Sequence, residues 1–392
     1  MQCINILEEI EVVFMGKFRI GLIIPTLDRG GAEKQLVLLA KGLNRELFEP
    51  HVVLLTRDGP YRKELEEAGI PVTLIGKRFK YDPTALIRLT RFLKTQRFDL
   101  VHTWLFAANC YGRVAARWAK VPHIVAGERC VDDWKNWGHF AIDRFLLRYT
   151  DRIVTNSMGV VEFYAKHGLP ANRFSVIANA IPPAPPARMT HKMACETLGV
   201  PDDAILIGAV GRLWPQKGVK ELVWGLELIR VVRKKSYLIV IGDGPERQRL
   251  EYYRDQVGVG SRVRFLGHRD DASDWIRCLD LMWNGSFYEG QSNAILEAMQ
   301  AGVPVIATDI PGNRDLVLPN QTGLLYRVGD SASLVRKTQK LLDDHDTYQR
   351  MSEASKKRVD EFFSVEAMIA AHEKLYREII TGQSSVEMKP SR

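Results

Sequence analysis

Two carboxylates, Glu289 and Glu297, stand with seven residues between them and are the most informative residues for chemistry. Glu289 follows an apolar run typical of a buried strand, and Glu297 lies about one turn into the helix expected over 294–301. Such a pair can act as general acid and base, or its oxygens can accept hydrogen bonds from sugar or ribose hydroxyls. A solvated loop glutamate beside a helix-surface glutamate would show the same spacing, so this pair alone leaves both interpretations open.

The residues between the two carboxylates predict a helix N-terminus. Ser292 or Asn293 is a good N-cap, and Gly302 suits the end of the helix. Gly290 lets the backbone approach a ligand closely. The backbone N–H groups of Gln291, Ser292 and Asn293 would point out of the helix start, which suits an anion or a sugar hydroxyl.

Two cations follow the strand expected over 205–210. Gly211 makes the turn, Arg212 comes next, and Lys217 precedes a helix that begins near Val219. Both cations would lie at one strand's carboxyl end beside a helix N-terminus, which is a positive pocket sized for a diphosphate. Two unrelated surface cations are the alternative, and the strand–helix junction favours the pocket.

Weaker signals lie in the first half of the chain. Gly30 and Gly31 follow the first expected strand and open the first helix, where adjacent glycines bring backbone N–H groups near a ligand. His102 ends the strand expected over 100–102, on the edge of the sheet where ligands bind. A Gly-Gly pair or a single histidine is weak evidence when taken alone.

Short apolar runs alternate with longer amphipathic stretches along the chain, including 32–47 and 220–233. This alternation predicts an α/β, doubly wound fold with parallel sheets covered on both faces. Ligands bind outside the carboxyl ends of such strands, so the cleft between two such domains is the expected site. The strands are expected at 19–24, 52–56, 72–75, 100–102, 124–126, 152–155, 174–177, 205–210, 237–241, 263–266, 279–283 and 303–308.

A chain of 392 residues is usually too long for a single hydrophobic core and forms two domains. A proline-rich stretch at 181–187 marks the linker between them. The fold is expected to start at Met15, where a short lead into the first strand begins. The residues before it carry three glutamates, which do not suit a signal peptide. We expect an extension outside the fold at 1–14, an N-terminal domain at 15–183, a C-terminal domain at 184–363, a helix at 364–382 and a disordered tail at 383–392.

Composition narrows the class of protein. Apolar residues are 46% and charged residues 26%, as in ordinary soluble globular proteins. The five cysteines lie far apart without a C-x-x-C pair, which predicts neither a disulfide framework nor a zinc site and favours a reducing, cytoplasmic setting. No apolar run reaches about 18 residues, so no spanning helix is predicted. The Asp-x-Asp at 344–346 does not follow a strand, and we predict no metal site.

The net charge of +8 favours an anionic partner. Lys and Arg form no run of five or more, and the excess is spread among acidic residues. This pattern favours a small anionic ligand or a loose membrane contact over a dedicated nucleic-acid surface.

Taken together, these motifs resemble the large retaining glycosyltransferase family 4, the glycosyl transferases group 1. The resemblance runs from about Arg19 to Ile380 and is stronger in the second half. The matching segments follow the family's order and spacing at 154–157, 176–181, 211–218, 242–245, 265–268, 289–297 and 302–306.

The resemblance implies a GT-B fold, with two facing Rossmann-like domains, an interdomain cleft, an acceptor-side N-terminal domain and a nucleotide-sugar-binding C-terminal domain whose last helix crosses back. It implies retaining, metal-independent transfer of a hexose-type sugar from a nucleotide diphosphate sugar to a glycan or lipid-linked acceptor in cell-surface polysaccharide or glycolipid biosynthesis. No cofactor and no nucleic acid are expected. The implied setting is cytoplasmic, with or without a peripheral contact on the cytoplasmic face of the membrane.

The resemblance also implies roles for single residues. Arg212 and Lys217 would neutralise the diphosphate, and Glu289 would contact the donor sugar hydroxyls. Glu297 would bind the ribose, and His102 would lie near the sugar. The catalytic set is thus His102, Arg212, Lys217 and Glu289, and the donor-binding set is Gly30, Gly31, Gly211, His268, Gly290, Gln291, Ser292, Asn293 and Glu297.

Two departures from the family pattern and two rival functions stay open. The family often has Asn-Gly-Ile/Val-Asp where this chain has Asn179-Ala-Ile-Pro182, and an aromatic residue often follows the glycine that matches Gly290. One rival is a sugar-nucleotide epimerase or a phosphorylase on the same fold. The other is a non-enzymatic protein that binds anions or nucleic acid, which would leave Glu289 and Glu297 unexplained.

Overall fold

The computed structural model describes residues 16–382, which form two compact units. The first unit comprises residues up to Gly127, Trp137–Ile153 and residues from Ile369, and the second comprises Glu128–Asn136 and Val154–Met368. Because the units exchange segments of chain, the boundary predicted near residue 183 stays a prediction. The extension predicted at 1–14 and the tail predicted at 383–392 lie outside the described residues.

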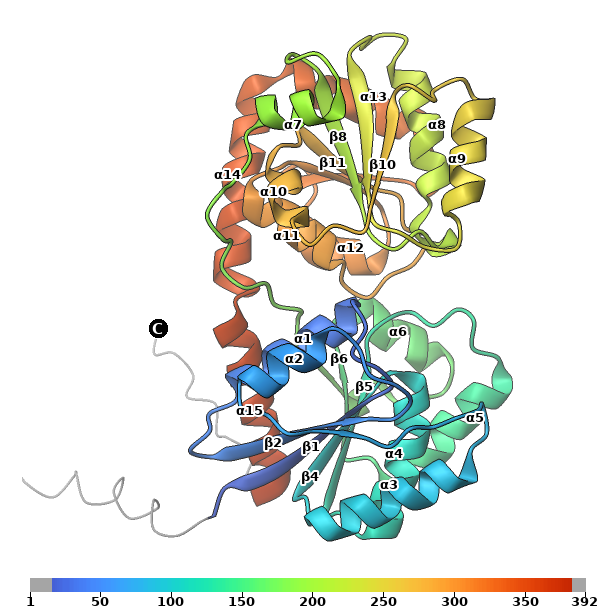
Figure 1. The fold of residues 1–392 in the computed structure, drawn as a ribbon, viewed down its shortest axis with the longest axis vertical. Coiled ribbons are helices and arrows are strands. Elements are labelled where there is room, and N and C mark those ends of the chain that lie inside the picture. The colour runs from blue at the N-terminus through green and yellow to red at the C-terminus, as the bar shows by residue number, and fades with distance from the viewer. Residues whose placement is uncertain (1–15, 383–392) are drawn as a thin grey trace, which may run out of the picture. The chain divides into compact units, whose positions relative to one another are not determined.

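The first sheet has seven strands in the order β3-β2-β1-β4-β5-β6-β7 (Figure 1). The pairs β2–β3, β1–β2, β1–β4 and β4–β5 are parallel. Figure 1 shows helices α1 and α2 on one side of it and α3 and α4 on the other. The strands are β1 (Phe18–Ile24), β2 (Phe48–Leu54), β3 (Val72–Leu74), β4 (Leu100–Trp104), β5 (His123–Glu128), β6 (Arg152–Thr155) and β7 (Phe174–Val176). The helices are α1 (Gly31–Gly42), α2 (Tyr61–Glu67), α3 (Pro83–Gln96), α4 (Leu105–Ala119), α5 (Trp137–Leu146), α6 (Met158–Lys166) and α15 (Val365–Thr381).

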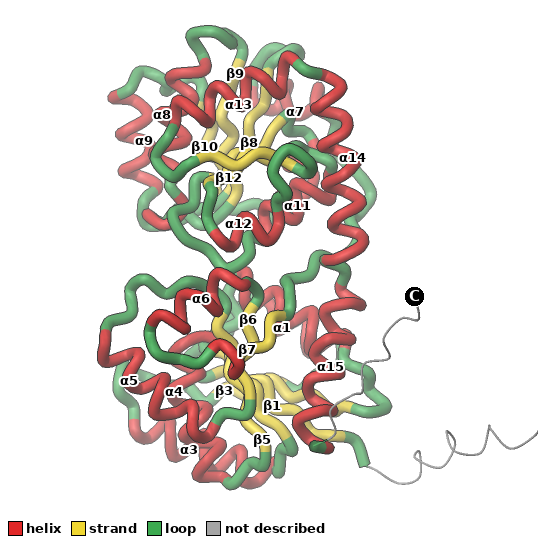
Figure 2. The backbone as a smooth tube through the Cα atoms, turned by 180° about the vertical axis from the view of Figure 1, so that it is seen from behind, coloured by secondary structure: helices red, strands yellow, loops and turns green. Residues whose placement is uncertain are grey.

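The second sheet has six strands in the order β10-β9-β8-β11-β12-β13, and each neighbouring pair is parallel. Figure 2 shows it from behind, with helices on either side. The strands are β8 (Ile205–Val210), β9 (Ser236–Ile241), β10 (Val263–Gly267), β11 (Leu281–Asn284), β12 (Val305–Thr308) and β13 (Gly323–Tyr326). The helices are α7 (His191–Leu198), α8 (Val219–Ile229), α9 (Arg247–Gln256), α10 (Ala272–Arg277), α11 (Asn293–Ala301), α12 (Pro311–Leu316), α13 (Ser331–Asp343) and α14 (His345–Phe362).

Alternate residues of the second sheet belong to two separate hydrophobic cores. Leu206 and Met282 pack in one core with α11, whereas their neighbours Ile207 and Trp283 pack in the other with α8. Side chains of a strand point alternately to opposite faces, so both faces of this sheet are buried. That double burial explains the continuous apolar runs in the sequence and confirms the α/β, doubly wound prediction.

Several element predictions differ from the structure: β2 begins at Phe48, β11 begins at Leu281 and α8 ends at Ile229. Strand β12 begins at Val305 and not at Val303, because the N–H of Val303 bonds the Ala298 carbonyl at 2.9 Å in the closing turn of α11. Helix α1 ends at Gly42 and not at 47, and an Asn44 turn leads into β2. Strand β13 was not predicted. Within residues 16–382, no helix is both long and apolar enough to cross a bilayer.

Candidate functional site

The cations predicted to follow β8 lie at its carboxyl end. Gly211 turns the chain with φ +147°, and the exposed Arg212 comes directly after it. Lys217 ends a short 3-10 turn, and Gly218 adopts the left-handed conformation (φ +59°) before α8 starts. A Cβ on Gly218 would lie 2.1 Å from the Gly285 carbonyl oxygen, so only glycine fits this crossing of the two loops.

Lys217 and Glu289 form an ion pair that joins the loop after β8 to the loop after β11. The Lys217 ammonium donates to Glu289 Oε1, and the Ser286 hydroxyl donates to the same oxygen at 2.9 Å. The side chains of Lys217 and Glu289 are only 23% and 8% exposed. Lys217 and Ser286 also line a pocket together with Gly211. Charges in such a shielded place interact more strongly than they would in open water.

A buried hydrogen-bond network supports the loop that carries Glu289. The Thr308 hydroxyl donates to the Ser286 carbonyl at 2.6 Å, and the Asn313 amide donates to Thr308 Oγ1 at 3.1 Å and Asn284 Oδ1 at 3.3 Å. All four supporting side chains are 6% exposed or less. Glu289 therefore sits on a preorganised support contributed by β11, β12 and α12.

Gly290 packs closely against protein on two sides. A Cβ there would lie 2.2 Å from the Arg129 carbonyl oxygen, and a Cβ on Gly312 would lie 1.6 Å from the Gly290 carbonyl oxygen. From the sequence, Gly290 was expected to let the backbone approach a ligand closely. The structure gives a different reason, which is the packing of this loop between residues 129 and 312.

Asn179 is the residue that sequence reasoning missed as a site residue. It is 4% exposed, and its amide donates to the Gln291 carbonyl at 3.1 Å and to Asn293 Oδ1 at 2.8 Å. Its backbone N–H donates to Gln291 Oε1 at 2.8 Å, and its own oxygen accepts from Arg129 and from Asn156. One side chain thus fixes the loop of residues 290–293. The available signal was a single amide inside the otherwise apolar segment 176–181.

Replacing Asn179 by Ala is expected to lower the free energy of unfolding by about 1–3 kcal/mol, because buried partners in the 290–293 loop lose their hydrogen bonds. A loosened loop should also raise the KM for the donor. Denaturant unfolding and donor titration measure the two effects. The exposed Asn172→Ala variant is the control, and an unchanged KM in a folded Asn179→Ala protein would show that this residue does not position the loop.

Helix α11 begins where the sequence placed it. Ser292 is its N-cap, although its side chain makes no capping hydrogen bond, and Gly302 ends it in the left-handed conformation. Glu297 lies about one turn inside and is partly exposed. Gln291 and Asn293 bond Asn179 through their side chains, and the Gln291 backbone carbonyl also accepts from the Asn179 amide.

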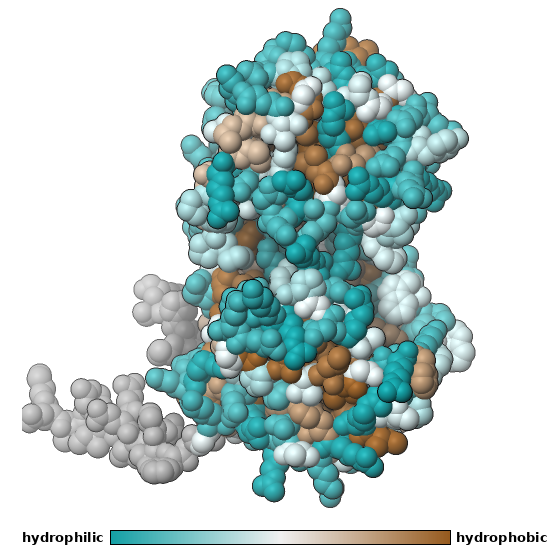
Figure 3. All heavy atoms as spheres, in the orientation of Figure 1, coloured by the Kyte–Doolittle hydropathy of each residue, from teal (hydrophilic) through white to brown (hydrophobic). Residues whose placement is uncertain are grey.

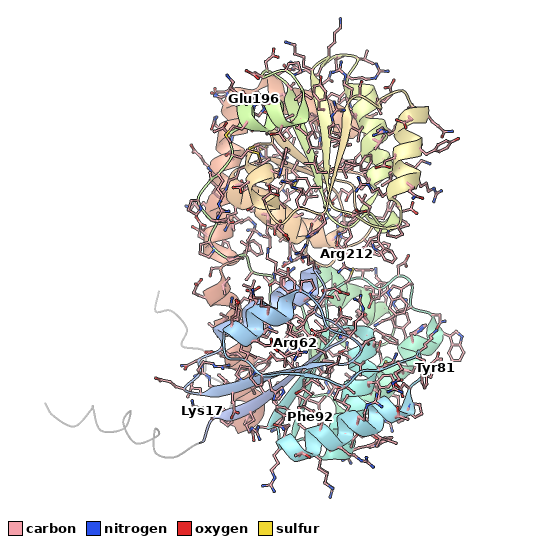
Figure 4. All side chains as sticks on the ribbon, viewed as in Figure 1. Lys17, Arg62, Tyr81, Phe92, Glu196 and Arg212 are labelled. Atoms are coloured by element: carbon pink, nitrogen blue, oxygen red, sulfur yellow. The ribbon has the colours of Figure 1, made fainter. Side chains whose placement is uncertain are left out.

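His268 lies just beyond β10, at the carboxyl edge of the same sheet. Its side chain is exposed, and its Nε2 lies 3.3 Å from Asp270 Oδ1. The adjacent Gly267 carbonyl accepts a hydrogen bond from the Gly242 N–H at 2.7 Å. The second unit therefore brings Arg212, Lys217, Glu289 and His268 to the carboxyl edge of one sheet, with β9 between the strand before His268 and the strand before Arg212 (Figure 4 labels Arg212).

The three site residues predicted in the first half belong to the first unit. Gly30 is the N-cap of α1 and Gly31 its first residue, as the sequence predicted. The prediction that His102 ends a strand is wrong, because β4 continues to Trp104. His102 is fully buried, and its Nδ1 lies 2.6 Å from the Tyr376 hydroxyl of α15. It therefore packs between the sheet and α15, and its predicted role near the sugar stays a prediction.

Cys130 lies close to the pocket but is not suited to act as a nucleophile. Its sulfur is 3.6 Å from the Gln216 amide nitrogen. Burial, followed by the nearby Glu289 carboxylate, raises the pKa of the Cys130 thiol to about 12, so the thiol stays protonated at neutral pH. Across residues 16–382, no group of three or more His, Cys, Asp or Glu side chains is arranged to hold a metal ion.

Family comparisons match both halves of the chain. Residues 195–358 match the model for glycosyl transferases group 1, and residues 29–184 match the model for glycosyltransferase family 4. Both Lys217 and the Glu289–Glu297 segment lie inside the first match. Gly30, Gly31, His102 and Asn179 lie inside the second.

Three relatives are similar over most of their length. A UDP-Gal:alpha-D-GlcNAc-diphosphoundecaprenol alpha-1,3-galactosyltransferase of Escherichia coli is 26% identical, over 77% of this chain and 81% of the relative. The lipopolysaccharide core biosynthesis glycosyltransferase LpsD of Rhizobium meliloti is 26% identical, over 88% and 95%. A GDP-mannose-dependent alpha-mannosyltransferase of Mycobacterium tuberculosis is 29% identical, over 76% and 81%.

A solved structure supports the fold. The Anabaena protein HepE in complex with UDP-glucose superposes with a TM-score of 0.82 at 22% identity, and the match covers 91% of this chain and 99% of that one.

Proposed function

Because the chain belongs to glycosyltransferase family 4, the group 1 glycosyl transferases, we propose that it moves a hexose-type sugar from a nucleotide diphosphate sugar to a glycan or lipid-linked acceptor, with retention and without a metal ion. The family places it among the transferases. The observation that carries the finer proposal is the shielded Lys217–Glu289 pair, which puts a cation and a hydroxyl acceptor side by side next to a pocket that Lys217 lines.

The relatives support a nucleotide-sugar donor without fixing its base. One relative is named for UDP-galactose and another for GDP-mannose, and the Anabaena structure contains UDP-glucose. In this chain, Lys217 and Arg212 would face the diphosphate and Glu289 the sugar hydroxyls. Glu297, one turn into α11, would bind the ribose, and the N–H groups at the start of α11 would contact phosphate or sugar.

Retention without a protein nucleophile suggests front-face attack. In this mechanism the bond from the anomeric carbon to the diphosphate oxygen lengthens first, and an oxocarbenium-like state forms. The acceptor hydroxyl attacks on the same face, and its proton passes to the departing diphosphate. Lys217, Arg212 and the start of α11 would stabilise the negative charge that grows on the leaving group, which is the electrostatic role that usually dominates. Lys217 would shift its hydrogen bond from Glu289 toward the phosphate.

The acceptor proposal rests on the relatives' names. The E. coli relative acts on a sugar linked to diphosphoundecaprenol, and the R. meliloti relative serves lipopolysaccharide core biosynthesis. A glycan or lipid-linked acceptor in cell-surface polysaccharide or glycolipid synthesis, reached from the cytoplasmic side, is consistent with both.

The anomeric configuration of the product tests this proposal. The protein would be incubated in EDTA with α-linked UDP and GDP sugars and a diphospholipid-linked sugar acceptor, and the new linkage would be followed by NMR from the first turnover. An α product formed in EDTA is expected. A β product would overturn retention, and turnover that requires added metal would overturn metal independence.

A further inference from the structure

The positive charge of the chain is concentrated in one segment of the first unit. Residues 77–97 contain seven Lys and Arg and a single acid, Asp82, so this segment alone carries +6 of the net +8. Asp82 is fully buried, which leaves the surface of the segment without a carboxylate. The expectation that the excess charge is spread along the chain is therefore wrong.

The segment begins with an exposed loop, residues 78–81, whose four side chains alternate between basic and aromatic. Phe79 is 56% exposed and Tyr81 is 76% exposed. Figure 4 shows the Tyr81 side chain pointing away from the body of the protein. Isolated apolar side chains are common on protein surfaces, but two exposed aromatic rings that alternate with Arg78 and Lys80 are a distinct feature.

Hydrogen bonds to the buried Asp82 hold this loop in place. The Asp82 carboxylate accepts from the Arg78 N–H at 3.0 Å and caps α3 at the Ala85 N–H, also at 3.0 Å. The Tyr111 hydroxyl of α4 accepts from the Asp82 N–H at 2.7 Å. Because its base is fixed in this way, the loop presents its rings without having to be ordered by a partner.

Helix α3 continues the same surface. Its exposed positions Thr84, Ile87, Arg91 and Lys94 recur at helical spacing, and Ile87 is 46% exposed. Arg88 ties the helix to the base of the loop by donating to the Ile75 carbonyl at 3.0 Å and the Gly76 carbonyl at 2.9 Å. In Figure 3, brown apolar and teal hydrophilic side chains alternate over the region of α3 and α4.

We propose that residues 78–94, the aromatic loop with the exposed face of α3, dock on an anionic lipid surface. Lys and Arg attract anionic headgroups, and aromatic rings settle at the level of the headgroups. The exposed aliphatic side chain of Ile87 can be buried among lipid chains, whereas a nucleic acid offers it no apolar contact. This favours a membrane over RNA or DNA. The proposal depends on this surface and not on the donor site, so its test is independent of transfer activity.

Vesicle co-sedimentation of the full chain tests the docking. The probes are vesicles of phosphatidylcholine alone and of phosphatidylcholine with phosphatidylglycerol. We expect binding only to the anionic vesicles. One Lys or Arg near such a surface changes the partition roughly fivefold, so Lys80→Glu with Arg91→Glu should weaken binding by more than about 25-fold. Phe79→Ser with Tyr81→Ser should also weaken it several-fold.

The matched control variants replace comparably exposed residues of the second unit. Phe362→Ser with Tyr252→Ser removes one exposed Phe and one exposed Tyr, and Lys357→Glu with Arg249→Glu reverses two exposed cations. These variants should bind as the wild type does. The proposal is overturned if the wild type ignores anionic vesicles, or if the control pairs lower binding as much as the loop variants do. If the loop variants lost binding to single-stranded nucleic acid and kept their binding to anionic vesicles, the surface would be assigned to a nucleic acid instead.

Discussion

The Lys217→Ala variant is expected to lose about 10²–10³-fold in kcat, because the cation that stabilises charge on the departing diphosphate is gone. Arg212→Ala should have a similar effect. Lys217 has the stronger structural case, since its ammonium is shielded and paired with Glu289. Steady-state kinetics with the preferred donor measure the loss, and the thermal midpoint shows that the variant is folded.

Lys220→Ala is the matched control for this experiment. Lys220 is an exposed lysine in the first turn of α8, and its ammonium lies over the Tyr253 ring at 4.8 Å and not toward the pocket. It should turn over normally. Near-normal turnover by both Arg212→Ala and Lys217→Ala would contradict the diphosphate assignment.

The second large effect is a difference between the two carboxylates: the Glu289 variant should change mainly kcat, and the Glu297 variant mainly the donor KM. Glu289→Gln keeps the side-chain shape but removes the charge that strengthens hydrogen bonds to donor hydroxyls and to Lys217. We expect kcat to fall roughly 10–100-fold. Glu297→Gln should instead raise the donor KM roughly tenfold with little change in kcat, because a ribose contact is equal in ground and transition states.

Each variant serves as the other's control, since both remove one carboxylate from the same short segment. Comparison of UDP or GDP sugars with the free nucleotide sharpens the test. Glu297→Gln should weaken both, whereas Glu289→Gln should weaken the sugar conjugate alone. The same change in KM and kcat for both variants would refute the separate roles.

Residues at the carboxyl ends of strands were predictable, because parallel topology fixes that edge. Arg212, Lys217 and Glu289 each follow a strand whose apolar run is unmistakable, since both faces of the sheet are buried. Strand length was harder to read. Thr103 and Trp104 extend β4 beyond His102 because they are fully buried in the sheet, and no local signal marks that burial.

Long-range partners could not be predicted from one sequence. Asn179 reaches residues 112 and 114 positions away in the chain, and periodicity carries no information on such pairing. The close packing of Gly290 against residues 129 and 312 is hidden for the same reason. Strand β13 was missed because it has only four residues, and its apolar run of Leu324, Leu325 and Tyr326 is too short to distinguish a strand from a loop.

Nucleotide binding in the absence of metal tests the central claim most directly. The wild type and Lys217→Ala would be titrated with UDP, GDP, ADP and their sugar conjugates in EDTA, and thermal unfolding followed. A ligand that binds only the folded state stabilises it by about 2.7 kcal/mol at a hundredfold excess over Kd. One nucleotide should raise the wild-type midpoint selectively, and Lys217→Ala should lose most of that shift. No shift from any of them at millimolar concentration would contradict a donor site built on Lys217 and Glu289.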